Sequence, residues 1–230
     1  MHYVKDTKKL NNLCEKFNSA QYLAIDTEFI RVKTYWPQLC LIQIYDGKEE
    51  VIIDPLEKEL DLSSFFKILN NKKIIKVIHA GRQDIEIFYN LTKKIPQNIF
   101  DTQIAAMVCG FGDSIGYESL VSQLLRKKID KTSRFTNWLN RPLSKKQLNY
   151  AISDVTHLFN IYPIIHEKIM QNKRVNWLKE EMEILTSKKT YELNPDNSWK
   201  RLKIRSLNKK SVGILTELSK WRELKAQKKN

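Results

Sequence analysis

Three closely spaced strand-like runs, followed by alternating helices and strands, limit what this chain can fold into. The runs are Tyr22–Phe29, Leu39–Tyr45 and Val51–Asp54, and the letters DG between the last two favour a hairpin turn. The runs therefore predict an antiparallel meander. Strands that alternate with helices further along the chain predict parallel pairing through crossover helices. Together the two patterns predict an α/β fold, in which helices flank a mixed sheet.

Apolar periodicity and capping residues predict the other elements. An early helix begins near Asp6-Thr7 and repeats apolar residues at helical spacing as far as Phe17. The later elements are expected, in chain order, at Leu62–Leu69 (helix), Ile74–Ile78 (strand), Ile85–Leu91 (helix), 99–109 (strand, then helix), 117–125 (helix) and 144–170 (helix with Ser144 as N-cap). Beyond Gln171 the chain is Lys-rich and helical, and Asn194-Pro195-Asp196 predicts a turn within it.

The charge of the chain favours a polyanionic partner. Its 40 Lys and Arg residues exceed the 26 Asp and Glu residues, and +9 of the net +14 lies in residues 171–230. Such a surplus is typical of nucleic-acid-binding proteins. A Lys-, Ile- and Asn-rich composition also follows from AT-rich coding alone, so charge by itself does not identify the partner.

Cysteine usage and hydropathy indicate the compartment. Cys14, Cys40 and Cys109 are odd in number, far apart and embedded in apolar segments, which predicts reduced thiols in a cytoplasmic protein. A zinc site would need Cys or His pairs at short spacing, which the sequence lacks. No signal peptide is recognisable, and no apolar run approaches the roughly 18–20 residues that a membrane span requires, so no membrane partner is expected.

Acidic residues stand at the ends of predicted elements in three places. Asp26 and Glu28, within AIDTEF, lie on the same side of a strand and repel each other unless a cation lies between them. Asp84 opens a helix in HAGRQD, where the glycine allows a tight turn. Tyr150 and Asp154 are four residues apart and share one face of a helix.

Carboxylate oxygens of this kind suit Mg²⁺ or Mn²⁺ better than zinc or copper. Two such ions, roughly 3.5–4 Å apart, can bracket an in-line displacement at phosphorus, where one activates a water and the other stabilises the leaving 3′ oxygen. Tyr150 would orient that water or help to take its proton. The residue types are therefore consistent with a two-metal phosphoryl-transfer site.

Each cluster also has an ordinary structural interpretation. Asp-Xaa-Glu is common at strand ends, the helix dipole favours an acid such as Asp84 in a first turn, and Tyr150 and Asp154 suit a core edge and a solvated face. Spacing along the chain does not show that the clusters converge, so the residues alone leave both interpretations open. His79 is expected to make structural hydrogen bonds. Four tryptophans are expected to anchor packing rather than to stack on bases: Trp138, Trp177, Trp199 and Trp221.

Four ordered segments resemble the ribonuclease D family of the DEDD superfamily, 3′→5′ exonucleases with a ribonuclease H-like fold. AIDTEFIRVKTYWPQLCLIQI resembles the first exonuclease motif of the family and KVIHAGRQDIEIF the second. FDTQIAA is similar to the segment that follows, and RPLSKKQLNYAISDV to the third motif. The resemblance covers residues 1–170 and continues more weakly through NSWKRLK and ELSKWRELKAQ.

The resemblance implies metal ligands at Asp26, Glu28, Asp84 and Asp154, and it places the water-positioning residue of the tyrosine subclass at Tyr150. It implies two divalent metal ions, Mg²⁺ or Mn²⁺, and hydrolysis of nucleotides from RNA 3′ ends with release of 5′-monophosphates. The RNA partners typical of the family are tRNA precursors and other small stable RNAs, and no obligate protein partner is inferred. Two alternatives stay open: a DNA-directed 3′→5′ exonuclease, and a non-catalytic RNA-binding scaffold, against which the intact acids and tyrosine argue.

The resemblance also divides the chain. Residues 1–170 are expected to form the exonuclease domain, 171–205 a helical linker, and 206–230 an incomplete first helix of an HRDC-like nucleic-acid-binding domain, which together give an α-helical C-terminal extension. The sequence departs from the family at Phe135 and Asn137, where Arg and Asp are usual. Because that segment precedes the helix of Tyr150 and could contact substrate, the departure puts rate and substrate preference in question.

Overall fold

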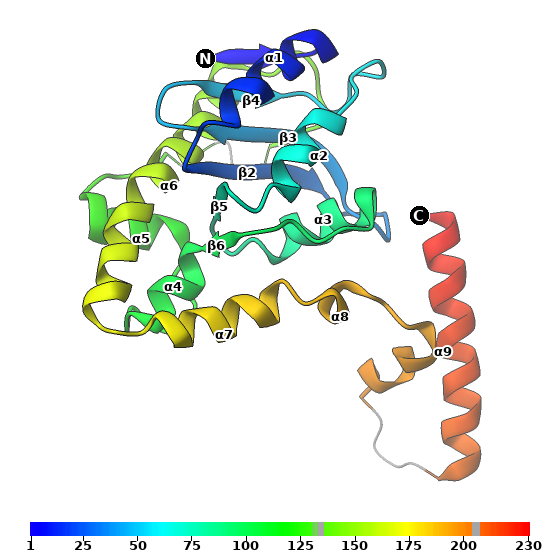
Figure 1. Cartoon of the computed structure of the whole chain (residues 1–230). Coiled ribbons are helices and arrows are strands. Elements are labelled where there is room, and N and C mark those ends of the chain that lie inside the picture. The colour runs from blue at the N-terminus through cyan, green and yellow to red at the C-terminus, as the bar shows by residue number, and fades with distance from the viewer. Residues whose placement is uncertain (131, 133–135, 204–207) are drawn as a thin grey trace.

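A mixed sheet forms the centre of the molecule (Figure 1). The computed structural model describes residues 1–130, 132, 136–203 and 208–230. Within these residues the sheet has six strands in the order β1-β4-β3-β2-β5-β6. In chain order the strands are β1 (His2–Val4), β2 (Tyr22–Ile30), β3 (Gln38–Tyr45), β4 (Glu50–Ile53), β5 (Ile75–Ile78) and β6 (Ile99–Asp101).

The pairing confirms the predicted mixed sheet. Strands β2, β3 and β4 form the antiparallel meander, whereas β2, β5 and β6 pair in parallel. Gly47, with φ +94°, provides the hairpin turn, and a Cβ there would lie 2.7 Å from Phe159 Cζ. The Asp46 carboxylate accepts hydrogen bonds from the backbone N–H groups of Lys48 at 2.9 Å and Glu49 at 2.7 Å. Strand β1 was not predicted, because three residues that pair in parallel with distant β4 carry no visible alternation.

The helices follow the predicted order, and capping residues fix several of their starts. They are α1 (Thr7–Phe17), α2 (Ser63–Asn70), α3 (Arg82–Thr92), α4 (Thr102–Val108), α5 (Tyr117–Leu125), α6 (Lys145–Gln171), α7 (Val175–Leu185), α8 (Lys188–Tyr191), the 3₁₀-helix η1 (Pro195–Arg201) and α9 (Lys209–Lys229). Asp6 accepts a hydrogen bond from the Lys9 N–H at 2.8 Å. Ser144 and Gln147 form a capping box at the start of α6, which confirms the predicted N-cap.

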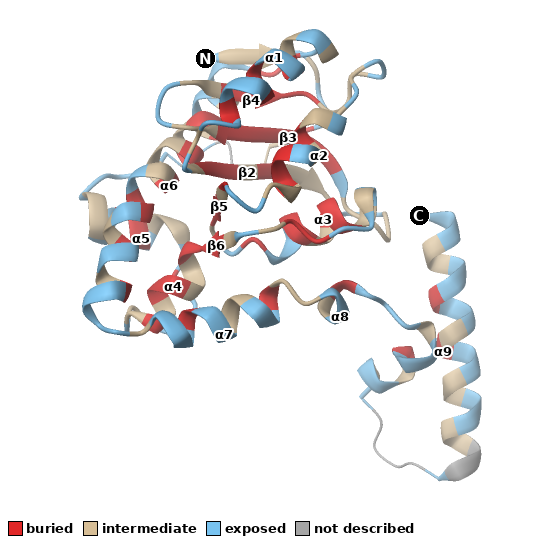
Figure 2. Cartoon of the chain, viewed as in Figure 1, coloured by how far each residue is buried: buried red, intermediate tan, exposed pale blue. Residues whose placement is uncertain are grey.

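Helices cover both faces of the sheet, and residue parity along β2 assigns the faces (Figures 1 and 2). Leu23 and Ile25 pack with α1, α2 and α3. Ala24 packs with α4, α5 and α6 instead. Because side chains alternate along a strand, the even-numbered residues that follow Ala24 point toward α6.

The C-terminal helices extend away from the sheet, and α9 lies against η1 (Figure 1). Glu223 of α9 is buried, accepts a hydrogen bond from the Tyr35 hydroxyl and pairs with Arg201 at 2.7 Å. Figure 2 shows the rest of α9 as largely exposed or half-buried. The division of the chain near residue 170 stays a prediction. No helix among the described residues is long and apolar enough to cross a membrane.

The tryptophans correct one expectation. Trp138 is 2% exposed and anchors packing as predicted. Trp177 and Trp221 are 60% and 61% exposed, so packing was the wrong interpretation for both. The Arg174 guanidinium lies over the Trp177 ring, 5.1 Å from its centroid, which is a cation–π geometry.

Candidate active site

Three of the predicted acids converge between β2 and α6. Carboxylate oxygens of Asp26, Glu28 and Asp154 all lie within 4.8 Å of one another. Asp26 and Glu28 share the parity of Ala24 and therefore point toward α6, while Asp154 is buried in the first half of that helix. The strand and the helix thus place three oxygen ligands around one point.

Asp84 lies beside this cluster and not within it. It stands in the first turn of α3, which covers the opposite face of the sheet, and it accepts a hydrogen bond from the Thr27 hydroxyl. Burial raises the pKa of Asp84 to about 6. Its charge is still near enough to contribute to the raised pKa of Asp26. Thr27, the residue between the two acids of β2, therefore links the fourth acid to the cluster.

The electrostatics of the cluster favour a cation. Burial raises the pKa of Asp26 well above its usual range, and the charges of Asp154, Asp84 and Glu28 raise it further, in that order. Several carboxylates gathered in one partly buried place are stable in their charged forms only if a positive charge compensates them. The donor set consists of carboxylate oxygens without Cys or His, which fits Mg²⁺ or Mn²⁺ and not zinc or copper.

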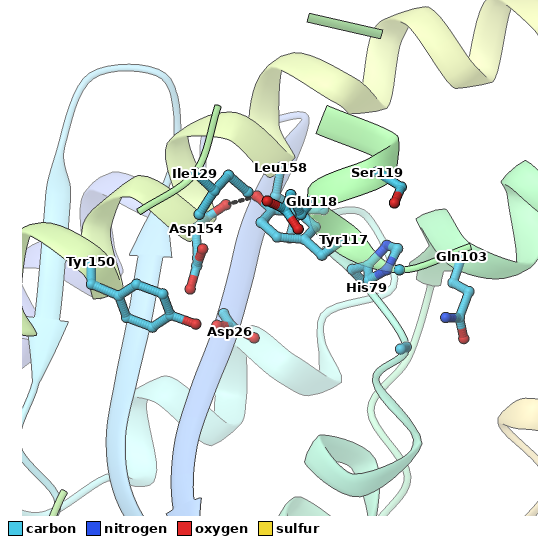
Figure 3. Close-up of a pocket in the computed structure, with 12 residues that line it drawn as sticks. Asp26, His79, Gln103, Tyr117, Glu118, Ser119, Ile129, Tyr150, Asp154 and Leu158 are labelled. Atoms are coloured by element: carbon cyan, nitrogen blue, oxygen red, sulfur yellow. Dashed lines mark hydrogen bonds between the residues drawn. The ribbon is translucent and has the colours of Figure 1, made fainter. Parts of the chain in front are cut away.

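Tyr150 lies one helical turn before Asp154 and points its hydroxyl toward the acids (Figure 3). The hydroxyl lies near the Asp26 and Asp154 side chains, on the same side of the cavity. Burial, followed by the charges of Asp154 and Glu28, raises the pKa of Tyr150 far above the usual phenol range. The phenol is therefore neutral at ordinary pH and acts as a hydrogen-bond donor. The Trp138 ring packs near it, with centroids 6.2 Å apart.

A cavity of ≈ 390 Å³ opens beside these side chains (Figure 3). Asp26, Tyr150 and Asp154 line one side of it. The other side is lined by residues from three further segments: His79, Ala80, Gln103, Gly116, Tyr117, Glu118 and Ser119. This volume lies in the range of small-molecule sites, roughly 300–1,000 Å³.

Tyr117 is a site residue that the sequence did not indicate. Its hydroxyl donates a hydrogen bond to the backbone carbonyl oxygen of Asp154, and its ring lies 5.1 Å from the His79 ring. Its only sequence signal is its place at the start of a predicted helix, which says nothing about chemistry. The His79 Nδ1 lies 2.9 Å from the Thr102 hydroxyl, which confirms the predicted structural hydrogen bond.

Of the two departures from the family pattern, the structure describes Asn137. Phe135 lies outside the described residues. Asn137 is exposed, and its side-chain oxygen accepts a hydrogen bond from the Leu139 N–H at 3.0 Å. This hydrogen bond shapes a turn that precedes α6, and Asn137 is not among the described residues that line the cavity.

Comparisons with known proteins agree with this geometry. A family model described as 3′-5′ exonuclease matches residues 1–170. A ribonuclease D of Nitrobacter hamburgensis is 43% identical over 230 residues, which are 100% of this chain and 60% of the relative. The crystal structure of Escherichia coli RNase D, an exoribonuclease involved in structured RNA processing, superposes with a TM-score of 0.90 and 33% identity over 99% of this chain and 61% of that chain.

A smaller neighbour carries a metal. Brucella melitensis NrnC with bound Mg²⁺ has a TM-score of 0.67 and 25% identity, and the match covers 83% of this chain and 92% of that one. By contrast, this chain spans about 60% of the length of the ribonuclease D relatives that it resembles.

Proposed function

Because this chain belongs to the 3′-5′ exonuclease family, we propose that it is a metal-dependent 3′→5′ exoribonuclease of the ribonuclease D type. One observation carries the proposal: the carboxylates of Asp26, Glu28 and Asp154 converge within 4.8 Å beside a cavity into which Tyr150 points. That arrangement suits the hydrolysis of a phosphodiester bond at a chain end.

Asp26, Glu28 and Asp154 would hold a divalent metal, and Asp84 would reach the site through water. The Mg²⁺ bound to NrnC supports this choice of ion, and two ions of Mg²⁺ or Mn²⁺ are proposed. When bound, such ions lower the pKa of water and stabilise the charge that develops on a leaving oxygen. The protein itself supplies a preorganised set of oxygen ligands, half-buried at Asp26 and Glu28 and buried at Asp154, which costs no rearrangement during the reaction.

Tyr150 would orient the attacking water. Its neutral phenol points toward the acids and lines the same cavity, so its hydroxyl is placed where it can hydrogen-bond with a water beside them. Of the two roles that the sequence left open for Tyr150, orientation is favoured over proton removal, because burial and nearby negative charge oppose formation of the phenolate.

The cavity would receive the 3′-terminal nucleotide. Its volume of ≈ 390 Å³ suits one nucleotide, and the acids at its edge would face the phosphate that joins it to the rest of the chain. RNA is proposed as the substrate class, with tRNA precursors and other small stable RNAs as natural substrates, since the E. coli neighbour processes structured RNA. A cytoplasmic location is proposed from the three cysteines, which are free thiols.

The test is an exonuclease assay on three substrates: a 3′-extended tRNA, an unstructured RNA and a matched DNA, each with and without Mg²⁺. We expect metal-dependent release of 5′-monophosphates from RNA. Asp154→Ala should abolish the activity, and Tyr150→Phe should lower kcat by about 10²-fold, in the range of general acid–base and orientation effects. Glu167→Ala, which changes an exposed acid of the same helix, is the matched control and should retain full activity.

Other outcomes would assign a different function. Degradation of DNA alone would identify a DNA-directed exonuclease with the same chemistry. RNA binding with no metal-dependent hydrolysis, and with no effect of Asp154→Ala, would identify a non-catalytic scaffold.

A further inference from the structure

Asp101 accepts hydrogen bonds from two separate parts of the backbone. It is the last residue of β6 and is 1% exposed. As the N-cap of α4 it accepts from the N–H groups of Gln103 at 2.8 Å and Ile104 at 3.4 Å. It also accepts from the N–H groups of Ala80 at 3.0 Å and Gly81 at 2.8 Å. A helix cap needs only the first pair, so the second pair requires a separate explanation.

The second pair belongs to a strained turn between β5 and α3. Ala80 has a φ of +53°, in the left-handed region that an alanine rarely adopts. Gly81 has an ordinary φ, yet a Cβ there would lie 2.2 Å from Ile78 Cδ1. The glycine is therefore required for close approach, and Ala80, not Gly81, makes the tight turn. Successive N–H groups in such a turn form an anion-binding concavity, and the Asp101 carboxylate fills it.

Thr102, which follows Asp101 in the chain, also contacts the turn between β5 and α3. Its hydroxyl lies 3.0 Å from the Ile78 carbonyl oxygen and 2.9 Å from His79 Nδ1. Asp101 and Thr102 together therefore hold three consecutive residues of the turn, from His79 to Gly81, as well as the end of β5.

The turn forms part of the cavity wall. His79 and Ala80 line the cavity on the side away from Tyr150, and Gln103 of α4 lies next to them (Figure 3). The same turn leads directly into α3 and sets the place of Asp84. One buried carboxylate thus holds two of the three further segments that line the cavity, the turn 79–81 and the start of α4.

We propose that Asp101 is a positioning residue for the exonuclease reaction. Its carboxylate holds the turn 79–81 and the start of α4 in one geometry, so that a terminal nucleotide in the cavity is aligned with the acids and Tyr150. This inference rests on the proposed function, because alignment matters only if a nucleotide is cleaved there. Misplacement of about 1 Å can cost about 10²-fold in rate.

Two variants test the proposal. Asp101→Ala removes all four acceptor contacts, whereas Asp101→Asn keeps one oxygen that can still accept from Ala80, Gln103 and Ile104. We expect kcat on RNA to fall by about 10–10²-fold in Asp101→Ala and by less in Asp101→Asn, while the Kd for RNA with an uncleavable 3′ end changes by less than about twofold. The matched control is Leu13→Ala in α1, a core truncation on the opposite face of the sheet that lowers stability without touching the cavity.

Amide hydrogen exchange gives a readout that does not depend on activity. In Asp101→Ala the amides of Ala80 and Gly81 should exchange at least about tenfold faster, while amides of α1 keep their protection. Unchanged exchange at residues 80 and 81, or a kcat no lower than that of Leu13→Ala under conditions where both are folded, would overturn the proposal. An inactive wild-type chain would refute the proposed function instead, and the exchange rates would still show whether Asp101 holds the turn.

Discussion

The hydroxyl of Tyr117 donates a hydrogen bond to the backbone carbonyl oxygen of Asp154. This bond joins the start of α5 to α6 at the residue that completes the acid cluster. Burial raises the pKa of Tyr117 well above the phenol range, with the charges of Asp154 and Asp26 as further causes, so the group stays a neutral donor. The contact ties α5 to α6 beside the acids, and the ring of the same residue lines the cavity.

Tyr117→Phe should therefore remove the hydrogen bond between α5 and α6 without creating a cavity in the core. The variant keeps the ring that packs near His79 and loses one part-buried hydrogen bond, which is worth about 0.5–1.5 kcal/mol in the free energy of unfolding. We expect that loss in urea denaturation, together with a several-fold fall in kcat. Tyr162→Phe is the control, because Tyr162 is a buried tyrosine of α6 whose hydroxyl has no hydrogen bond among the described residues. Equal kcat values for the two variants would contradict the prediction.

Asp26→Asn should have opposite effects with and without metal. In EDTA the variant should be more stable than the wild type, because it removes one of the charges that repel each other in the cluster. A gain of about 1 kcal/mol would appear as a Tm increase of roughly 2–4 °C. With Mn²⁺ the wild type should gain stability by ligand linkage and the variant should gain much less. A lower Tm of the variant in EDTA would show that the acids do not destabilise the metal-free protein.

The sequence predicted the parts of the site that depend on local geometry. Alternation along β2 was enough to place Asp26 and Glu28 on one side, and helical spacing was enough to pair Tyr150 with Asp154. The meeting of the strand with α6 is a long-range contact that no local period encodes, so the residues alone left it open and the family resemblance supplied it. Asp84 shows the limit of that reasoning, because its place depends on Thr27 and on the opposite face of the sheet.

The errors in the predicted fold also come from long-range contacts that no local pattern encodes. Strand β1 exists because β4 offers a parallel partner, and its own three residues carry no pattern. Trp177 and Trp221 are apolar enough to be assigned to packing, yet their exposure is decided by where their helices lie. The turn after β5 was assigned to Gly81 by residue type, whereas Ala80 takes the left-handed conformation because the Asp101 carboxylate binds the N–H groups there.

The burial of Lys76 predicts that the free energy of unfolding changes with pH in the alkaline range. It is fully buried in β5, and its ammonium group donates to the carbonyl oxygens of Asn71 and Ile74 at 2.7 and 2.9 Å. Burial lowers its pKa from 10.5 to about 8. Between those two values the unfolded chain binds more protons than the folded one, so the Lys76 contribution to the free energy of unfolding rises with pH. Below about pH 8 the buried charge costs its full penalty.

Lys76→Met should remove this dependence. Raised thiol and phenol pKa values, such as that of Cys40 at about 11, also act in this range, so the difference between the two proteins is the quantity to measure. From pH 7 to pH 10 the wild type should gain about 2 kcal/mol relative to the variant, since one pKa unit corresponds to about 1.4 kcal/mol. Urea denaturation at intervals of half a pH unit gives both curves. Parallel curves would mean that Lys76 titrates normally.

The half-buried Arg141 and the buried Asp54 form an ion pair that holds the segment before α6 against the sheet. The guanidinium donates to both Asp54 carboxylate oxygens, at 2.5 and 2.6 Å, and to the backbone oxygen of Cys40 at 2.9 Å. The Tyr3 hydroxyl donates to the same carboxylate at 2.5 Å. Although burial opposes its charged form, hydrogen bonds from Arg141 and Tyr3 give Asp54 a lowered pKa. The stabilisation is therefore present above the usual Asp range and is lost as the pH falls through the lowered value.

Replacing Arg141 alone should lower the free energy of unfolding more than replacing Arg141 and Asp54 together. Arg141→Met leaves the buried Asp54 carboxylate without its counter-charge, and such uncompensated charges cost about 3–5 kcal/mol. Asp54→Asn leaves Arg141 partly exposed and able to reach water, so it should cost less. The double variant should be more stable than Arg141→Met alone, because the neutral amide no longer needs the cation. A double-mutant cycle from urea denaturation measures this coupling, and strictly additive losses would mean that the pair contributes through packing alone.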